Sequence, residues 1–239
     1  MVIKGNCVAI IPARGGSKRI PKKNIINFYG KPLIAWTIKA AKESGIFDHI
    51  IISTDDQDIA EVSKEYGAEV PFLRDQYADD HSPVSLATIH TLLHAETFLE
   101  KEFLNVVQLM PNCPLRSSND ILEAYNYFTE NNHSFQISCF KFGWMNPWWA
   151  VKLDSNLIPK PLFKEVYAMR SQDLETLYCP TGAIWIANKK NLVKENTFYG
   201  KDYIYYPLDW KAAIDIDNQE DLEMAQSVWI MENNINGNN

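Results

Sequence analysis

The chain has 239 residues, of which 46% are hydrophobic and 22% charged, and its formal net charge is -7. This length and composition predict one globular domain over residues 1–232, with enough apolar side chains for a sizeable core. The acidic balance argues against DNA or RNA as the main partner. No apolar run approaches the ~18 residues that a membrane span needs, so we expect no membrane contact. The four cysteines lie far apart, which favours a reduced, cytoplasmic protein without disulfides or a zinc site.

Short apolar runs alternate with amphipathic segments through the first part of the chain. Residues 8–11 are wholly apolar and predict a strand buried on both faces. Residues 32–44 predict a helix that stops at Gly45, and residues 49–53 predict the next buried strand, which another helix follows. Strands and helices alternating at this spacing predict a doubly wound α/β fold with a mainly parallel sheet.

The same pattern continues after the second predicted helix. Pro83 is expected to begin a long helix with Leu86, Ile89 and Leu93 directed toward the core. Residues 104–109 predict a further buried strand. These elements extend the predicted sheet by one strand and its covering helix.

Beyond Ser118, which we expect to cap the next helix, the regular pattern weakens. Residues about 140–180 mix proline, aromatic and charged positions and predict a small inserted lobe, although a long loop region would show the same composition. Residues 212–216 predict a strand that leads up to Asp217. The asparagine-rich end, 233–239, predicts a disordered tail.

The segment after the first predicted strand combines glycines with cations. Gly15 and Gly16 would let a ligand approach the main chain closely. Backbone N–H groups and cations at the C-terminal end of a central strand suit a polyphosphate. The spacing of the glycines matches neither the P-loop pattern G-x-x-x-x-G-K-[ST] nor the dinucleotide-binding pattern G-x-G-x-x-G. The alternative is a solvated basic turn, because lysine and arginine mostly lie on protein surfaces. The polar donors are Arg14, Ser17, Lys18, Arg19, Lys22, Lys23 and Asn24.

Two aspartates near the C-terminal end form a candidate metal site. Asp215 and Asp217 flank Ile216, so on a strand both carboxylates would point to the same side. Mg²⁺ takes one or two protein carboxylates and completes its shell with phosphate oxygens and water. The alternative is a helix capping box made by Asp217 with Glu220. The spacing alone favours neither the metal site nor the capping box.

The chain resembles the acylneuraminate cytidylyltransferases, also called CMP-sialic acid synthetases, because it contains a set of their motifs in the same order. The matching segments span nearly the whole chain and include Ile11-Pro-Ala-Arg-Gly-Gly-Ser-Lys18, Ile20-Pro-Lys-Lys-Asn24, Ser53-Thr-Asp55, Pro114-Leu-Arg116, Phe198-Tyr-Gly200 and Ile214-Asp-Ile-Asp217. The resemblance implies a nucleotide-diphospho-sugar transferase-like fold whose inserted lobe serves dimerisation. It also implies Mg²⁺ as cofactor, CTP and a nonulosonic acid as substrates, and a homodimer.

The resemblance assigns roles to individual residues. It implies that Asp215 and Asp217 hold Mg²⁺, and that Arg14 and Lys23 stabilise charge on the departing pyrophosphate. It places the nucleotide against Ala13, Arg14, Gly15, Gly16, Ser17, Lys23, Asn24, Arg74, Asp80 and Ser82. No side chain stands out as the base that takes the hydroxyl proton.

The expected sugar pocket departs from the family pattern. Met110 replaces a glutamine, Cys179 an arginine and Trp185 a tyrosine, so polar positions have become apolar or aromatic. These changes favour a sugar with a deoxy methyl end and two acylamino groups over N-acetylneuraminic acid. The expected sugar-binding residues are Met110, Trp149, Arg170, Trp185, Phe198 and Tyr199. The alternatives are a cytidylyltransferase for Kdo or another sugar, and a non-catalytic nucleotide-binding protein of the same fold.

Overall fold

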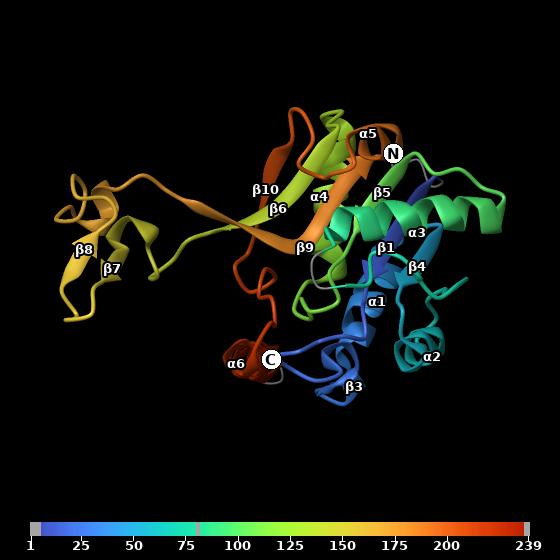
Figure 1. Cartoon of the computed structure of the whole chain (residues 1–239), viewed down its shortest axis with the longest axis horizontal. Coiled ribbons are helices and arrows are strands. Elements are labelled where there is room, and N and C mark those ends of the chain that lie inside the picture. The colour runs from blue at the N-terminus through green and yellow to red at the C-terminus, as the bar shows by residue number, and fades with distance from the viewer. Residues whose placement is uncertain (1–5, 80–81, 237–239) are drawn as a thin grey trace.

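A computed structural model describes residues 6–79 and 82–236 of the chain (Figure 1). Its centre is a six-stranded sheet in the order β10-β6-β9-β5-β1-β4. β1 is parallel to β4 and β5, and β10 is parallel to β6, whereas β9 runs antiparallel to both of its neighbours. The predicted mainly parallel α/β sheet is therefore confirmed. The strands are β1 (Cys7–Pro12), β4 (His49–Ser53), β5 (Asn105–Gln108), β6 (Phe135–Lys141), β9 (Tyr178–Asn188) and β10 (Ile204–Leu208).

Helices cover both faces of this sheet. β1 shows why: Ala9 and Ile11 pack in the cluster that includes side chains of α1 and α4, while Val8 and Ile10 pack against α3 and α5. Figure 1 shows α3 on one face and α1 on the other. A strand enclosed in this way must be apolar at every position. The helices are α1 (Leu33–Ser44), α2 (Gln57–Glu65), α3 (Val84–Leu99), α4 (Ser118–Glu130), α5 (Lys189–Glu195) and α6 (Gln219–Asn236).

A third apolar cluster joins residues 20–36 to residues 214–229. α6 packs Ala225 and Val228 against Phe28 of the small β2–β3 hairpin and against Ile216, just before the helix. Phe28 also meets the ring of Trp229 edge-on at 5.6 Å. The cluster therefore brings the segment that carries Asp217 next to the basic loop after β1. The hairpin strands are β2 (Asn27–Phe28) and β3 (Lys31–Pro32), and the 3-10 helix η1 (Lys23–Ile25) precedes them.

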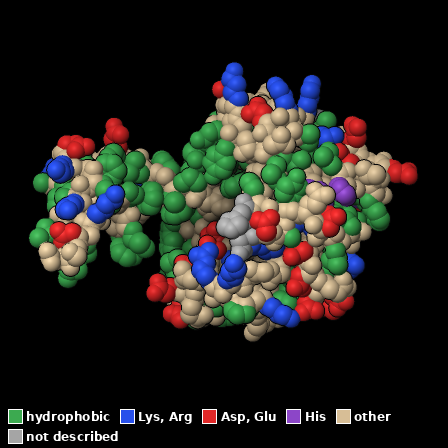
Figure 2. Space-filling model, viewed as in Figure 1, with side chains coloured by type: hydrophobic (Ala, Val, Ile, Leu, Met, Phe, Trp, Pro, Cys, Tyr) green, Lys and Arg blue, Asp and Glu red, His purple; other side chains and the backbone are tan. Residues whose placement is uncertain are grey.

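The chain between β6 and β9 forms a lobe that stands away from the main sheet (Figure 1). It contains the antiparallel pair β7 (Val151–Leu153) and β8 (Pro159–Pro161), with the 3-10 helices η2 (Pro147–Trp149) and η3 (Ser171–Asp173). Figure 2 shows hydrophobic side chains on the lobe and on the edge of the main body that faces it. Segment 140–180, where the sequence predicted an inserted lobe, corresponds to this part of the chain.

Several local predictions differ from the structure. Leu93 is exposed on α3, and the neighbouring Leu92 is buried in its place. The N-cap of α4 is Ser117, whose side chain and backbone form a capping box with Asp120, so the prediction of Ser118 was one residue late. Residues 212–216 form no strand. α6 continues to Asn236, into the segment predicted as a disordered tail, and 237–239 lie outside the described residues.

Within the described ranges, none of the helices has the length and apolar character that crossing a bilayer requires.

Leu92 and Leu93, which are adjacent on α3, provide a test of how α3 packs against the sheet. Leu92→Ala should lower the free energy of unfolding by about 2–5 kcal/mol, because it removes a fully buried side chain and leaves a cavity. Leu93→Ala is the matched control, since Leu93 is 40% exposed, and it should change stability far less. Urea unfolding of both variants measures the difference. Equal losses would contradict the observed orientation of α3.

Candidate active site

The basic loop begins where β1 ends at Pro12. The Ala13 N–H donates to the Ser53 carbonyl at 2.9 Å, and the Gly15 N–H donates to an Asp55 carboxylate oxygen at 2.9 Å. A Cβ at Gly15 would lie 2.6 Å from the Asp56 carboxylate, so the position requires glycine. Gly16 has open space where a side chain would stand. The loop is therefore held tightly against the end of β4 at its first glycine and is open at the second.

A cavity of about 440 Å³ opens over this loop. Its described lining includes four cationic residues and a single carboxylate, Asp217. So many positive charges in a chain of net charge -7 give the cavity a local potential suited to a polyanion. The lining residues are Pro12, Arg14, Ser17, Lys18, Arg19, Ile20, Lys23, Asn24, Met110, Pro111, Asn112 and Asp217.

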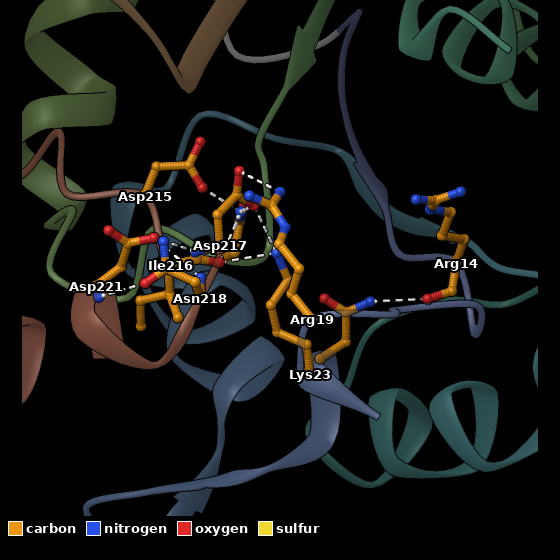
Figure 3. Close-up of polar contacts among 10 residues, drawn as sticks. Arg14, Arg19, Lys23, Asp215, Ile216, Asp217, Asn218 and Asp221 are labelled. Atoms are coloured by element: carbon orange, nitrogen blue, oxygen red, sulfur yellow. Dashed lines mark hydrogen bonds and ion pairs between the residues drawn. The ribbon is translucent and has the colours of Figure 1, made fainter. Parts of the chain in front are cut away.

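Asp217 forms ion pairs with two of these cations, Lys23 and Arg19 (Figure 3). Lys23 Nζ lies 2.9 Å from Asp217 Oδ1, and Arg19 Nη2 lies 2.7 Å from Asp217 Oδ2. Burial opposes ionisation of Asp217, but these two partners outweigh it and hold its pKa below the usual range. Arg14 lies apart from the two aspartates in Figure 3, and its carbonyl accepts from Asn24 Nδ2 at 3.0 Å. The cavity thus has a carboxylate at one side and Arg14 at another.

Asp215 lies beside Asp217 in a different electrostatic environment. Burial, followed by the nearby charge of Asp217, raises the pKa of Asp215 to about 6. Asn112 Nδ2 donates to an Asp215 carboxylate oxygen and to the Ile216 carbonyl. Asn112 Oδ1 is buried and has no partner. The sequence interpretation missed Asn112, although its place in a proline-rich loop after β5 was a signal, because polar residues there reach the ligand edge of the sheet.

The capping interpretation of Asp217 is wrong. Asn218 caps α6: the Asp221 N–H donates to Asn218 Oδ1 at 3.1 Å, and the Asn218 N–H donates to the Asp221 carboxylate at 2.9 Å. Glu220 takes no part in these hydrogen bonds. The side chain of Asp217 is therefore available to the cavity, directed there by a cap one residue later in the chain.

Two buried arginines, Arg74 and Arg116, donate hydrogen bonds to backbone carbonyls near the cavity. Arg74 donates from Nη1 to the Ser53 carbonyl and hydroxyl at 3.2 and 2.7 Å, and burial lowers its pKa. Arg116 donates from Nη1 to the Ala183 carbonyl at 2.6 Å and to that of Met110 at 3.3 Å, and burial lowers its pKa to about 10. Arg74 does not line the cavity, although the sequence placed it against the nucleotide.

The remaining predicted nucleotide contacts divide into four groups. Ser17 and Asn24 line the cavity, whereas Ala13 is fully buried beneath it. Ser82 is outside the lining, and its hydroxyl donates to the Asp79 carboxylate. Asp80 lies outside the described residues. The structure therefore brings together the loop residues and the C-terminal aspartates, but not the segment around Ser82.

The predicted sugar contacts are dispersed. Met110 lines the cavity beside Gly182, where a Cβ would lie 2.8 Å from the Met110 side chain. On β9 Trp185 contacts the rings of Phe198 and Tyr199 at 5.6 and 5.5 Å; Phe198 is wholly inside the core, and Tyr199 is 44% exposed. Trp149 and Arg170 lie in the lobe between β6 and β9. Within a single chain, Met110 is therefore the only one of the six predicted sugar contacts that lines the basic cavity.

An apolar groove of about 620 Å³ adjoins the aspartates. Asp215 and Gly182 are part of its lining, together with aromatic and methionine side chains from β6, from the start of the lobe, from the loop after β10 and from α6. Among them are Phe140, Phe142, Trp144, Met145, Trp210 and Met224.

Comparisons with known proteins agree with this geometry. The family model described as Cytidylyltransferase matches residues 8–226. Pseudaminic acid cytidylyltransferase of Campylobacter jejuni is 36% identical over 93% of this chain and 95% of its own length. CMP-N,N'-diacetyllegionaminic acid synthase of Legionella pneumophila is 34% identical over 92% and 95%.

Among solved structures, CMP:2-keto-3-deoxy-manno-octonic acid synthetase complexed with CTP shares the fold. Its TM-score is 0.69 at 15% identity, and the match covers 95% of this chain and all of that one. The cation-lined cavity at the C-terminal edge of the sheet agrees with such a fold. The match over residues 8–226 and the identity to whole-length relatives show that the chain belongs to the cytidylyltransferase family and is a nucleotidyltransferase.

Proposed function

We propose that this protein transfers CMP from CTP to the anomeric hydroxyl of a nonulosonic acid and releases pyrophosphate. The observation that carries the proposal is the cavity in which four cations of the N-terminal loop face Asp217. The names of the Campylobacter and Legionella relatives support the class of sugar. All four cysteines are free thiols, as in proteins of a reducing compartment, so the proposal includes a cytoplasmic location.

The reaction needs positioning and charge neutralisation more than covalent chemistry. The oxygen of the anomeric hydroxyl attacks the α-phosphorus of CTP and its proton passes to water, while the bond to the bridging oxygen breaks and pyrophosphate leaves with its electron pair. Arg14 and Lys23 reach the same cavity and stabilise the charge that develops on the departing group. The open backbone at Gly16 leaves room for phosphate oxygens to approach the main chain.

Mg²⁺ is the cofactor that this donor set suits. Asp215 and Asp217 supply two hard carboxylates, and Asn112 Nδ2 lies within hydrogen-bonding reach of both. No group of three or more acidic, histidine or cysteine side chains in 6–79 and 82–236 could hold a metal ion. A two-carboxylate site accords with Mg²⁺, which takes most of its shell from phosphate and water. When bound, the ion would neutralise charge on the triphosphate.

Asp217→Asn should lose most CTP- and sugar-dependent pyrophosphate release, because an amide cannot supply the negative charge that a metal ligand needs. The fold should survive with a modest fall in melting temperature, because the Arg19 pair is exposed and contributes little, and Lys23 keeps its hydrogen bond to the Ile216 carbonyl. Glu220→Gln is the control and should leave both quantities unchanged. Wild-type turnover by Asp217→Asn would contradict the metal role, and no pyrophosphate release from the wild type with any sugar would favour a non-catalytic nucleotide-binding protein.

Lys23→Ala should reduce turnover at saturating CTP by roughly 10²-fold, if Lys23 meets charge that develops in the transition state. Lys22→Ala is the matched control, because the neighbouring Lys22 pairs with Asp58 outside the cavity. Steady-state rates of pyrophosphate release compare the two. An unaltered turnover number for Lys23→Ala would assign Lys23 a purely structural role.

We further propose a sugar with a deoxy methyl end and two acylamino groups, of the pseudaminic or legionaminic type. Met110 is the apolar side chain at the junction of the cavity and Gly182, at the position where a family glutamine was expected. A sugar hydroxyl buried there without a partner costs roughly 1–3 kcal/mol. A buried methylene at the same place gains about 0.8 kcal/mol. The names of the two relatives at 36% and 34% identity support the same choice.

A competition assay distinguishes the sugars. With equal concentrations of a di-N-acetyl 9-deoxy nonulosonic acid, N-acetylneuraminic acid and Kdo, the first should yield about 10- to 100-fold more CMP-sugar. Chromatography of the nucleotide products measures the ratio. Met110→Gln should shift the products toward N-acetylneuraminic acid, because it restores a hydrogen-bonding group. Preference of the wild type for N-acetylneuraminic acid or Kdo would contradict the proposed sugar class.

A homodimer is also part of the proposal. The lobe exposes large apolar side chains such as Trp144, Leu157 and Ile158, and an apolar groove lies at its base. Apolar surfaces of this kind favour burial in an interface. A second copy would bring its own Trp149 and Arg170 toward a neighbouring cavity, which accounts for their distance from the site in a single chain.

A further inference from the structure

Both carboxylate oxygens of Asp217 are engaged by cations. Arg19 Nη2 contacts Oδ2 at 2.7 Å, and Lys23 Nζ contacts Oδ1 at 2.9 Å (Figure 3). A metal ion that uses either oxygen must share it with a cation or displace that cation. The two positive charges also repel a divalent ion at close range. The ion pairs therefore oppose metal binding in the arrangement seen here.

The two cations are held with different strength. Lys23 is anchored a second time, by donation to the Ile216 carbonyl at 2.7 Å, and its side chain is only 14% exposed. The Arg19 side chain is 63% exposed, and among the described residues its guanidinium forms an ion pair with Asp217 alone. An exposed ion pair is worth little and exchanges partners readily. Arg19 is therefore the cation that can leave Asp217.

A triphosphate offers Arg19 a stronger partner in the same place. Arg19 lines the cavity together with Arg14 and Lys18, so phosphate oxygens bound there lie within the reach of its long side chain. Arginine binds phosphate through two parallel hydrogen bonds, which are stronger than an exposed pair with one carboxylate oxygen. Movement of Arg19 to the phosphates would free Asp217 Oδ2 for a metal ion.

We propose that Arg19 binds the triphosphate and that, when no nucleotide is bound, it blocks Asp217 Oδ2 by its ion pair. We call this ion pair the latch. Its release makes nucleotide and divalent cation each promote binding of the other. The inference rests on the proposed function, since it takes CTP and a metal ion as the ligands. Coupling between two ligands is reciprocal: if the triphosphate releases Asp217 for the metal, bound metal keeps Arg19 available to the triphosphate. The sequence placed Arg19 among the donors of a loop that suits a polyphosphate, but the family resemblance gave it no contact with the nucleotide and no link to Asp217.

The test uses the full chain and Mn²⁺ as a spectroscopic probe. Electron paramagnetic resonance titration without nucleotide gives the affinity for Mn²⁺ directly. Arg19→Gln should bind Mn²⁺ about fivefold or more tightly than the wild type, because the latch on Oδ2 is gone. Lys22→Gln removes a neighbouring charge that pairs with Asp58 instead, and it should bind Mn²⁺ as the wild type does. Thermal unfolding of each variant checks that the fold is retained.

A second measurement separates the latch from a simple charge effect. Calorimetric titration with CTP in the presence of EDTA should show weaker binding by Arg19→Gln than by the wild type and Lys22→Gln. The latch is overturned if Arg19→Gln matches the wild type in either titration, or if Lys22→Gln shifts as much as Arg19→Gln does. If wild-type protein binds no CTP at all, the proposed function fails; if CTP binds and turns over but Mn²⁺ affinity ignores Arg19, only the latch fails.

Discussion

One lysine joins the two loops on which the site depends. Lys23, in the loop after β1, donates to the Ile216 carbonyl at 2.7 Å and pairs with Asp217 at 2.9 Å, across 193 and 194 residues of sequence. Its side chain is largely buried, and a buried ammonium without partners would be costly. The basic loop and the carboxylate loop therefore hold each other in place. The cluster of α6 with Phe28 supports the same junction with apolar contacts.

The parts of the fold that follow from local pattern were predictable. β1 is apolar at each position because helices enclose both of its faces, and that run is visible in the sequence. Gly45 ends α1 with a φ of 68°, which glycine adopts without strain. The sequence also grouped the loop cations as one site, and the structure places four of them with Asp217 around a single cavity. The spacing of the two aspartates alone did not decide between a metal site and a helix cap.

The rest depended on tertiary contacts that spacing does not encode. Leu92 and Leu93 are equally apolar, and only the angle at which α3 meets the sheet decides which is buried. Asp217 and Asn218 could both cap α6, and the choice falls to Asn218 because Lys23 and Arg19 occupy the carboxylate of Asp217. Ile214 and Ile216 are apolar because they pack against α6, not because they extend a sheet.

The proposed phosphate site and the proposed sugar contacts are supported by different parts of the fold. Cations and aspartates of the site come from loops pinned to the buried sheet, where Arg74 and Arg116 fasten the supporting backbone. Met110 shares that rigid support through Arg116 and Gly182, whereas Trp149 and Arg170 lie on the projecting lobe. Substitutions in the lobe can therefore alter contacts to a sugar while the phosphate site keeps its geometry. Met110 is the exception, because any change in its size acts on the backbone beside Asp215 as well as on the ligand.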